Sequence, residues 1–214
     1  MPDWVTISSL ATAGGTLVLA LATFSSTRSA NRAARVAERS LLEGLRPLIV
    51  ASRFEDPPEK ISFADQHWVR VPGGHGAIEV TADVEYLALA LRNAGRGMAV
   101  LHGWIAYASE QTSRPDHQPL EAFRRLGRDI YIAPGDRGFW QGAVRDPNEP
   151  IFAELRAAAT DRMPITIELL YGDQTGGQRA ISRFSLLPHD DPAGDLVWLA
   201  AVSRHWHLDR EAPR

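Results

Sequence analysis

The sequence contains no cysteine among its 214 residues. This absence excludes disulfide bonds, thiol nucleophiles and thiolate metal sites. It is typical of a reducing compartment, although exported proteins can share it. A strong excess of positive charge is also missing: the net charge is −3, and from residue 47 onward acidic residues outnumber basic ones by five. We therefore expect no nucleic-acid partner, because such a partner requires a basic surface.

Charge is absent from a long stretch near the N-terminus. Trp4–Phe24 contains 21 residues without a charged side chain, and 13 of them are Ala, Val, Ile, Leu, Phe or Trp. As a helix this stretch is ~30 Å long, which matches the hydrocarbon core of a bilayer. Trp4 and Phe24 stand at its ends, where aromatic side chains favour the membrane–water interface. We therefore predict a transmembrane helix over residues 4–24, with the lipid bilayer as its partner.

Two other interpretations of this stretch remain open. A cleaved signal peptide begins with a basic segment, whereas residues 1–3 include Asp3 and no basic residue. A buried helix of a soluble protein seldom continues this far without a charged side chain. Both alternatives therefore fit the stretch less well than a membrane span does.

Arginines follow the apolar stretch directly. They are Arg28, Arg32, Arg35 and Arg39, whereas Asp3 is the only charged residue before the stretch. Because positive residues favour the cytoplasmic side, we expect a single-pass protein of the cell membrane, with its N-terminus outside and its C-terminal domain in the cytoplasm. The arginines share one helix face, which either lies along anionic lipid headgroups or is solvated.

Proline is absent between Pro2 and Pro47, and strong helix formers fill the second half of this interval. The helix is expected to continue as a stalk to about Gly44. A stripe of small residues on the stalk leaves pairing with a second copy open. We therefore divide the chain into residues 1–46, a transmembrane helix with its stalk, and residues 47–210, a β domain.

From residue 47 onward, apolar and polar residues alternate with a period of two between Gly- and Pro-rich turns. The segment 84–92 is apolar on both faces, which predicts a central strand covered on both sides. One helix is predicted over 151–159, with Asn148 as its N-cap ahead of Pro150. Seven to nine strands with one short crossover helix predict a mainly β fold, a sandwich of two sheets. Ten segments are candidates for these strands, residues 48–54, 67–71, 77–80, 84–92, 100–108, 129–133, 138–144, 164–171, 178–187 and 197–208.

The segment Leu91–Val100 reads Leu-Arg-Asn-Ala-Gly-Arg-Gly-Met-Ala-Val. It resembles the L-x-N-x-G-x-G-x-A stretch of many uncharacterised bacterial membrane proteins. The resemblance implies their layout, a short N-terminal anchor, a helical stalk and a cytoplasmic immunoglobulin-like β domain, and it brings no assigned activity. Asn93, Gly95 and Gly97 would form a fold-signature turn, because these residue types tolerate positive φ.

Two groups of polar residues suggest chemistry, each with a structural alternative. His205, His207 and Asp209 alternate along one strand face and so form a candidate metal site, but they lie near the chain terminus. Arg92 and Arg96 surround the glycine turn and could hold an anion, or the turn could be a structural corner.

Other signs of catalysis are weak. The chain has no Gly-x-Ser-x-Gly elbow, and its paired carboxylates stand in loops beside prolines. We therefore expect no cofactor and consider an enzyme the less favoured interpretation. The preferred function is a membrane-anchored interaction or scaffold module that binds a protein partner or a second copy. The alternative is a small-ligand-binding or enzymatic β domain tethered to the membrane.

Overall fold

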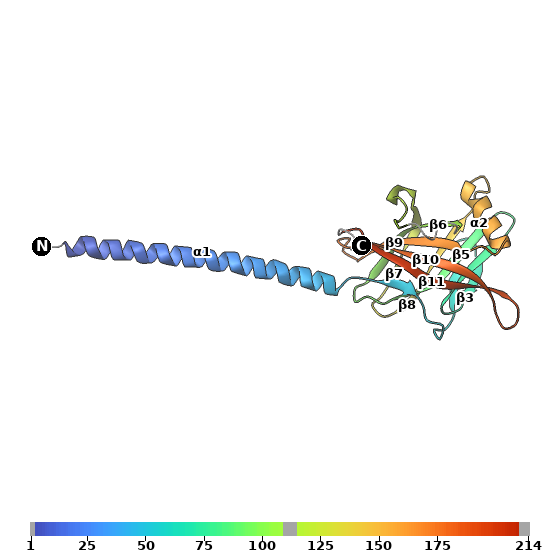
Figure 1. Cartoon of the computed structure of the whole chain (residues 1–214), viewed down its shortest axis with the longest axis horizontal. Helices are drawn as coiled ribbons and strands as arrows, with labels where there is room; N and C mark the ends of the chain where they lie inside the picture. The colour runs from blue at the N-terminus through green and yellow to red at the C-terminus, as the bar shows by residue number, and fades with distance from the viewer. Residues whose placement is uncertain (1–2, 109–114, 210–214) are drawn as a thin grey trace. The chain divides into compact units, whose positions relative to one another are not determined.

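The computed structural model describes residues 3–108 and 115–209, except for the side chains of residues 4–11 and 39. The chain divides into two units, residues 1–44 and 45–214. The first is helix α1 (Trp4–Gly44), one continuous helix (Figure 1), which confirms the predicted N-terminal helix. The second is the β domain.

Helix α1 exposes its side chains at every position where they are described. Thr16, Thr23 and Thr27 donate their hydroxyl groups to backbone carbonyl oxygens one turn earlier, as Thr16 does to Thr12 at 2.9 Å. Phe24 and the three arginines 28, 32 and 35 border one shallow groove of the helix. The side chains of Trp4 and Arg39 lie outside the described residues.

The apolar character of α1 differs from the expectation. Within the residues that the structure describes, no helix has a stretch both long enough and apolar enough to cross a membrane. The prediction of a transmembrane helix over residues 4–24 is therefore not confirmed. The physical reason is composition, because six Ser and Thr residues and two Gly residues dilute the apolar side chains of that stretch.

The β domain is built on one nine-stranded antiparallel sheet in the order β1-β5-β4-β11-β10-β9-β6-β7, with β8 paired to β5. A second sheet contains β2 and β3. The strands are β1 (Ile49–Ala51), β2 (Glu59–Ser62), β3 (Trp68–Val71), β4 (His75–Val80), β5 (Glu85–Asn93), β6 (Ala99–Ala108), β7 (Arg124–Ile132), β8 (Arg137–Val144), β9 (Ile165–Gly172), β10 (Arg179–Asp190) and β11 (Leu196–His207). A 3₁₀ turn, η2 (Leu120–Ala122), precedes β7.

The main sheet is curled. Strands β7 and β8 are its two edge strands, and because they follow each other directly in the chain, the opposite edges of the sheet must lie near each other. Trp104 of β6 and Trp140 of β8 meet inside the curl with their ring centroids 5.2 Å apart. A single core of buried side chains connects the two sides. The mainly β class is confirmed. An immunoglobulin-like sandwich of two sheets is not, because hydrogen bonding links these nine strands into one sheet.

Strand β5 confirms the predicted central strand. Leu87, Leu89 and Leu91 are fully buried in the main core, and the alternate residues Tyr86, Ala88 and Ala90 belong to a second core under β2 and β3. Strand β2 was not predicted from the sequence, and it pairs with β3. The small second sheet therefore covers the outer face of β5.

Helix α2 (Pro150–Thr160) confirms the predicted helix and buries Phe152, Leu155 and Ala158. The predicted cap is wrong. The N-cap is Glu149 without a side-chain cap bond, and the Asn148 amide bonds to Asp146 instead. The fixed φ of Pro150 starts the helix without help from a capping side chain.

Candidate functional site

The Asn93 side chain holds together the turn that the sequence singled out. Its Oδ1 atom accepts hydrogen bonds from the backbone N–H groups of Leu48 (3.2 Å) and Gly95 (3.0 Å). Its Nδ2 atom donates to the carbonyl oxygens of Gly97 (2.7 Å) and Ile132 (3.0 Å). Asn93 is fully buried, and these bonds use its whole amide. The turn therefore joins β5, β7 and the chain just after α1.

The two glycines of this turn are required for a different reason than expected. Neither Gly95 nor Gly97 has positive φ, and neither does Asn93. A Cβ on Gly95 would overlap the carbonyl oxygen of Arg46, and one on Gly97 would overlap that of Leu45. The glycines therefore allow the backbone after α1 to approach closely, which is a structural role.

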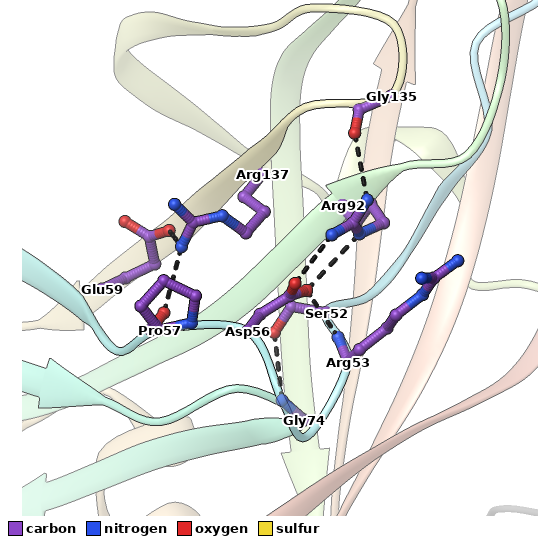
Figure 2. Close-up of polar contacts among 9 residues, drawn as sticks. All are labelled: Ser52, Arg53, Asp56, Pro57, Glu59, Gly74, Arg92, Gly135 and Arg137. Carbon is purple, nitrogen blue, oxygen red and sulfur yellow. Dashed lines mark hydrogen bonds and ion pairs between the residues drawn. The ribbon is translucent and has the colours of Figure 1, made fainter.

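Of the two arginines beside the glycine turn, Arg92 is already bound to an acidic side chain. Arg92 bonds to the Asp56 carboxylate at 2.7 Å and to the carbonyl oxygen of Gly135 at 3.1 Å (Figure 2). The hydrogen bond from Arg92 lowers the pKa of Asp56. Asp56 also accepts a hydrogen bond from the Arg53 backbone, so Arg92 fixes the loop after β1. Arg96 is exposed.

The candidate metal residues His205, His207 and Asp209 each contact another side chain of the domain. Asp209 accepts two hydrogen bonds from Arg46, at 2.9 and 2.6 Å, which hold its pKa at about 2. His207 Nδ1 lies 3.3 Å from the same guanidinium group. His205 Nδ1 lies 2.7 Å from the Ser182 hydroxyl group. Among the described residues, no group of three or more metal-ligand side chains is assembled.

A buried ion pair on the outer face of the sheet was not predicted. Arg183 and Glu168 are 2.6 Å apart with side chains 2% and 0% exposed. The Tyr107 hydroxyl and the Gln118 backbone N–H both donate to Glu168 at 2.9 Å, and Arg183 donates to the carbonyl oxygen of Asp116. Burial and the nearby carboxylate raise the pKa of Tyr107 to about 12. Because these groups satisfy one another, the cluster fastens residues 115–118 onto the sheet.

A cleft lies where the curled sheet fails to close, between β7 and β8. This seam cleft has a volume of about 550 Å³. Within the described strands, β7 pairs only with β6 and β8 only with β5. The seam cleft is lined by Trp104, by residues 62–64, 124–128 and 130, and by residues 141–143 and 145.

Four arginines border the seam cleft, and acidic residues hold two of them in place. Arg124 forms an ion pair with Glu149 and lies over the Trp104 ring, 5.5 Å from its centroid. Arg145 binds Asp65 at 3.0 Å. Hydrogen bonds from the Tyr86 hydroxyl and from Arg145 lower the pKa of Asp65 to about 2, so the carboxylate is ionised at neutral pH.

The other two arginines, Arg125 and Arg128, form no ion pair with a described acidic residue. Arg128 lies over the Phe139 ring at 6.0 Å. Both belong to β7, both are exposed, and both line the seam cleft. Their charges are therefore available to a ligand.

The floor of the seam cleft is aromatic and partly polar. Trp104 lies there against Trp140, and Phe63 forms part of one wall. The Oε1 atom of Gln141 is buried without a hydrogen-bond partner among the described residues. The described lining contains no carboxylate and no imidazole. The arrangement therefore suits binding of an anion better than acid–base catalysis.

The sequence carried one signal for this site that was not used. Arg124, Arg125 and Arg128 lie close together, followed by Arg145, in a domain that is acidic overall. Their convergence could not be predicted, because it depends on the curl that brings β7 opposite β8.

Comparisons with known proteins add little. No protein-family model and no curated protein matches this chain. Among solved structures, the chain is similar to a crystal structure of a protein from Archaeoglobus fulgidus. The two share 10% sequence identity over 64% of this chain and 95% of that chain, with a TM-score of 0.25. A likeness this weak carries no argument about fold or function.

Proposed function

We propose that this chain is an interaction module whose β domain binds an anionic partner in the seam cleft and whose helix α1 holds that domain at a membrane. The observation that carries the proposal is the gathering of four arginines around one cleft of a domain with a negative charge balance. Guanidinium groups bind carboxylates and phosphates through paired hydrogen bonds. A basic cleft in an acidic domain therefore favours an anionic ligand over other ligands.

The four arginines contribute to binding in two ways, two as side chains already held in place and two as charges unpaired within the described residues. Glu149 and Asp65 hold Arg124 and Arg145 in fixed positions at the rim, so little side-chain freedom is lost when a ligand binds. Arg125 supplies a charge that no described acid neutralises, as does Arg128. The cleft volume of about 550 Å³ lies within the range of ligand sites.

The membrane part of the proposal rests on the exposed apolar side chains of α1. Leu17, Val18, Leu19 and Leu21 are each more than 60% exposed and point to different sides of the helix. Large apolar side chains all around a helix require an apolar environment, which lipid supplies. The arginines that follow, beginning with Arg28, favour a cytoplasmic β domain and an outer N-terminus.

We also propose that the chain is related to the bacterial membrane proteins with an immunoglobulin-like β domain that residues 91–100 resemble. The antiparallel strands, the shared core and the α1 helix before the domain support it. The turn centred on Asn93 supports it further. The four hydrogen bonds of the Asn93 side chain hold this turn together, so the residues of the stretch 91–100 act in one structural feature.

A small-ligand-binding or enzymatic β domain is the second candidate. The volume of the seam cleft favours it, because a compact anion would fit there. The lining described above lacks a general acid or base, which favours binding over catalysis.

The proposal is tested by titrating full-length protein in detergent with two anionic probes, tripolyphosphate and hexaglutamate, at low ionic strength. R125E/R128E should weaken binding of at least one probe about tenfold or more, because the added carboxylates repel the anion. R70E/R179E is the matched control, since it reverses two exposed arginines outside the cleft. Equal affinities for the parent protein and R125E/R128E would show that the seam cleft is not the anion site.

A further inference from the structure

The two strands that border the seam cleft each have an open edge. β7 is bonded to β6 on one side, β8 is bonded to β5 on one side, and neither has a second partner among the described strands. A strand edge of this kind exposes backbone N–H and C=O groups that can bond to another extended chain. Residues 124–128 and 141–143 of these strands both line the cleft, so the open edges and the arginines occupy the same place.

The pairing of β7 with β6 is also interrupted where β7 lines the cleft. Leu101 of β6 is paired with Ile130, whereas Gly103 is paired with Arg125. Residues 126–129 of β7 therefore stand opposite a single residue of β6. Such a bulge removes part of the ladder and turns its backbone away from the parent sheet. These residues lack regular ladder partners on β6, and residues 126–128 among them line the cleft.

Charges and bulges on edge strands commonly prevent unwanted pairing, and they could serve only that purpose here. Three observations favour a binding site. The charges are of one sign, two of the arginines are oriented by Glu149 and Asp65, and an aromatic floor that includes Trp104 lies beneath them. Repulsion alone requires neither the orientation nor the floor. One-signed charge also admits acidic chains while it excludes others.

Extending the function proposed above, on which this inference rests, we propose that the seam cleft takes an extended acidic segment of a partner protein. The segment adds as a strand to the open edge of β7 at residues 125–129. Its backbone bonds to the free edge, and its carboxylates meet the guanidinium groups of Arg125 and Arg128. The backbone supplies affinity, and the arginines select for acidic side chains.

The test uses full-length protein in detergent and a labelled ten-residue peptide that alternates Glu and Thr. A matched peptide has the same residues with alternate backbone nitrogens methylated on the edge that would pair. The unmodified peptide should bind, and methylation should weaken it about tenfold or more, because each lost backbone hydrogen bond lowers affinity. On binding, the amides of residues 125–129 should exchange more slowly with solvent.

The outcomes separate this inference from the function on which it rests. If both peptides bind equally and R125E/R128E weakens both, the cleft binds anions but strand addition is wrong. If only tripolyphosphate binds in an arginine-dependent way, the ligand is a compact anion and the acidic segment is wrong. If no anion binds in an arginine-dependent way, the proposed function fails as well.

Two controls keep these results interpretable. Thermal unfolding of R125E/R128E and R70E/R179E must match that of the parent, so that lost binding is not lost folding. Sedimentation at increasing concentration reports a second copy as occupant. Self-association that R125E/R128E abolishes and the acidic peptide does not displace would contradict the inference.

Discussion

The guanidinium group of Arg46 donates two hydrogen bonds, of 2.9 and 2.6 Å, to the carboxylate of Asp209. The pair joins the chain just after α1 to the residues just after β11, so that the two ends of the β domain are tied together. The hydrogen bonds from Arg46 hold the pKa of Asp209 at about 2, below the ordinary value of 3.8 for an aspartate side chain.

This pair predicts a pH dependence for D209N. A carboxyl group with a lowered pKa stabilises the fold above its unfolded pKa and loses that contribution as the pH falls through its folded value. D209N should therefore lower the free energy of unfolding at pH 7 by about 1 kcal/mol or less, given the partial exposure of the pair. The difference between variant and parent should shrink between pH 4 and pH 2. Urea unfolding of the full chain across this range measures it, and a difference that stays constant contradicts it.

The buried amide of Asn93 predicts a large loss of stability in N93A. The change removes four hydrogen bonds and leaves the buried backbone groups of the turn without partners. We expect the free energy of unfolding to fall by about 3 kcal/mol, because each unsatisfied buried group costs roughly 1 kcal/mol or more. N148A is the control, since Asn148 is exposed and bonds only locally to Asp146. Similar unfolding midpoints for the two variants would mean that Asn93 does not hold the turn.

Strands could be predicted from the sequence where the pattern of apolar residues matches the faces that the fold buries. The two apolar faces of β5 predicted its cover on both sides, and the alternation of apolar and polar residues predicted strands over 164–171 and 178–187, which are β9 and β10. Strand β2 was missed because two of the four residues in Glu59–Ser62 are charged and a Pro-Pro pair precedes it. Its stability comes from Ile61 in the second core, which is a contact between distant segments.

The candidate sites were harder to predict because they depend on long-range partners. The alternation of His205, His207 and Asp209 suggested a metal, but Arg46, which stands 163 positions before Asp209, takes the carboxylate. The glycines at 95 and 97 were correctly marked as special, yet the cause is the backbone of residues 45–48 packed against them, not their own φ.

The ion pair between Arg183 and Glu168 predicts strong destabilisation by R183M. The substitution leaves a fully buried carboxylate without its partner, which should lower the free energy of unfolding by about 3–5 kcal/mol. The matched control is R162M, because Arg162 pairs with Asp190 at the surface with both side chains more than half exposed. That control should cost about 0.5 kcal/mol or less. The double variant E168Q/R183M should recover part of the loss, and equal effects of R183M and R162M would contradict the burial argument.

The exposed leucines of α1 predict association with lipid. Full-length protein removed from detergent in the presence of vesicles should float with them in a density gradient. L17S/L19S/L21S should reduce the floating fraction severalfold, because it removes apolar surface that lipid would cover. R70E/R179E, which leaves α1 unchanged, should float like the parent. Equal flotation of the leucine variant and the parent would remove the support for a membrane-bound helix.

The seam cleft as the site of an anionic partner is tested most directly by exchanging charge on both sides. Binding of two ten-residue peptides, one alternating Glu with Thr and the other Lys with Thr, is measured on the parent protein and on R125E/R128E. We predict that the parent prefers the Glu peptide and that the variant loses or reverses this preference, because the sign of the two free charges in the cleft has changed. The same preference in both proteins would contradict the account.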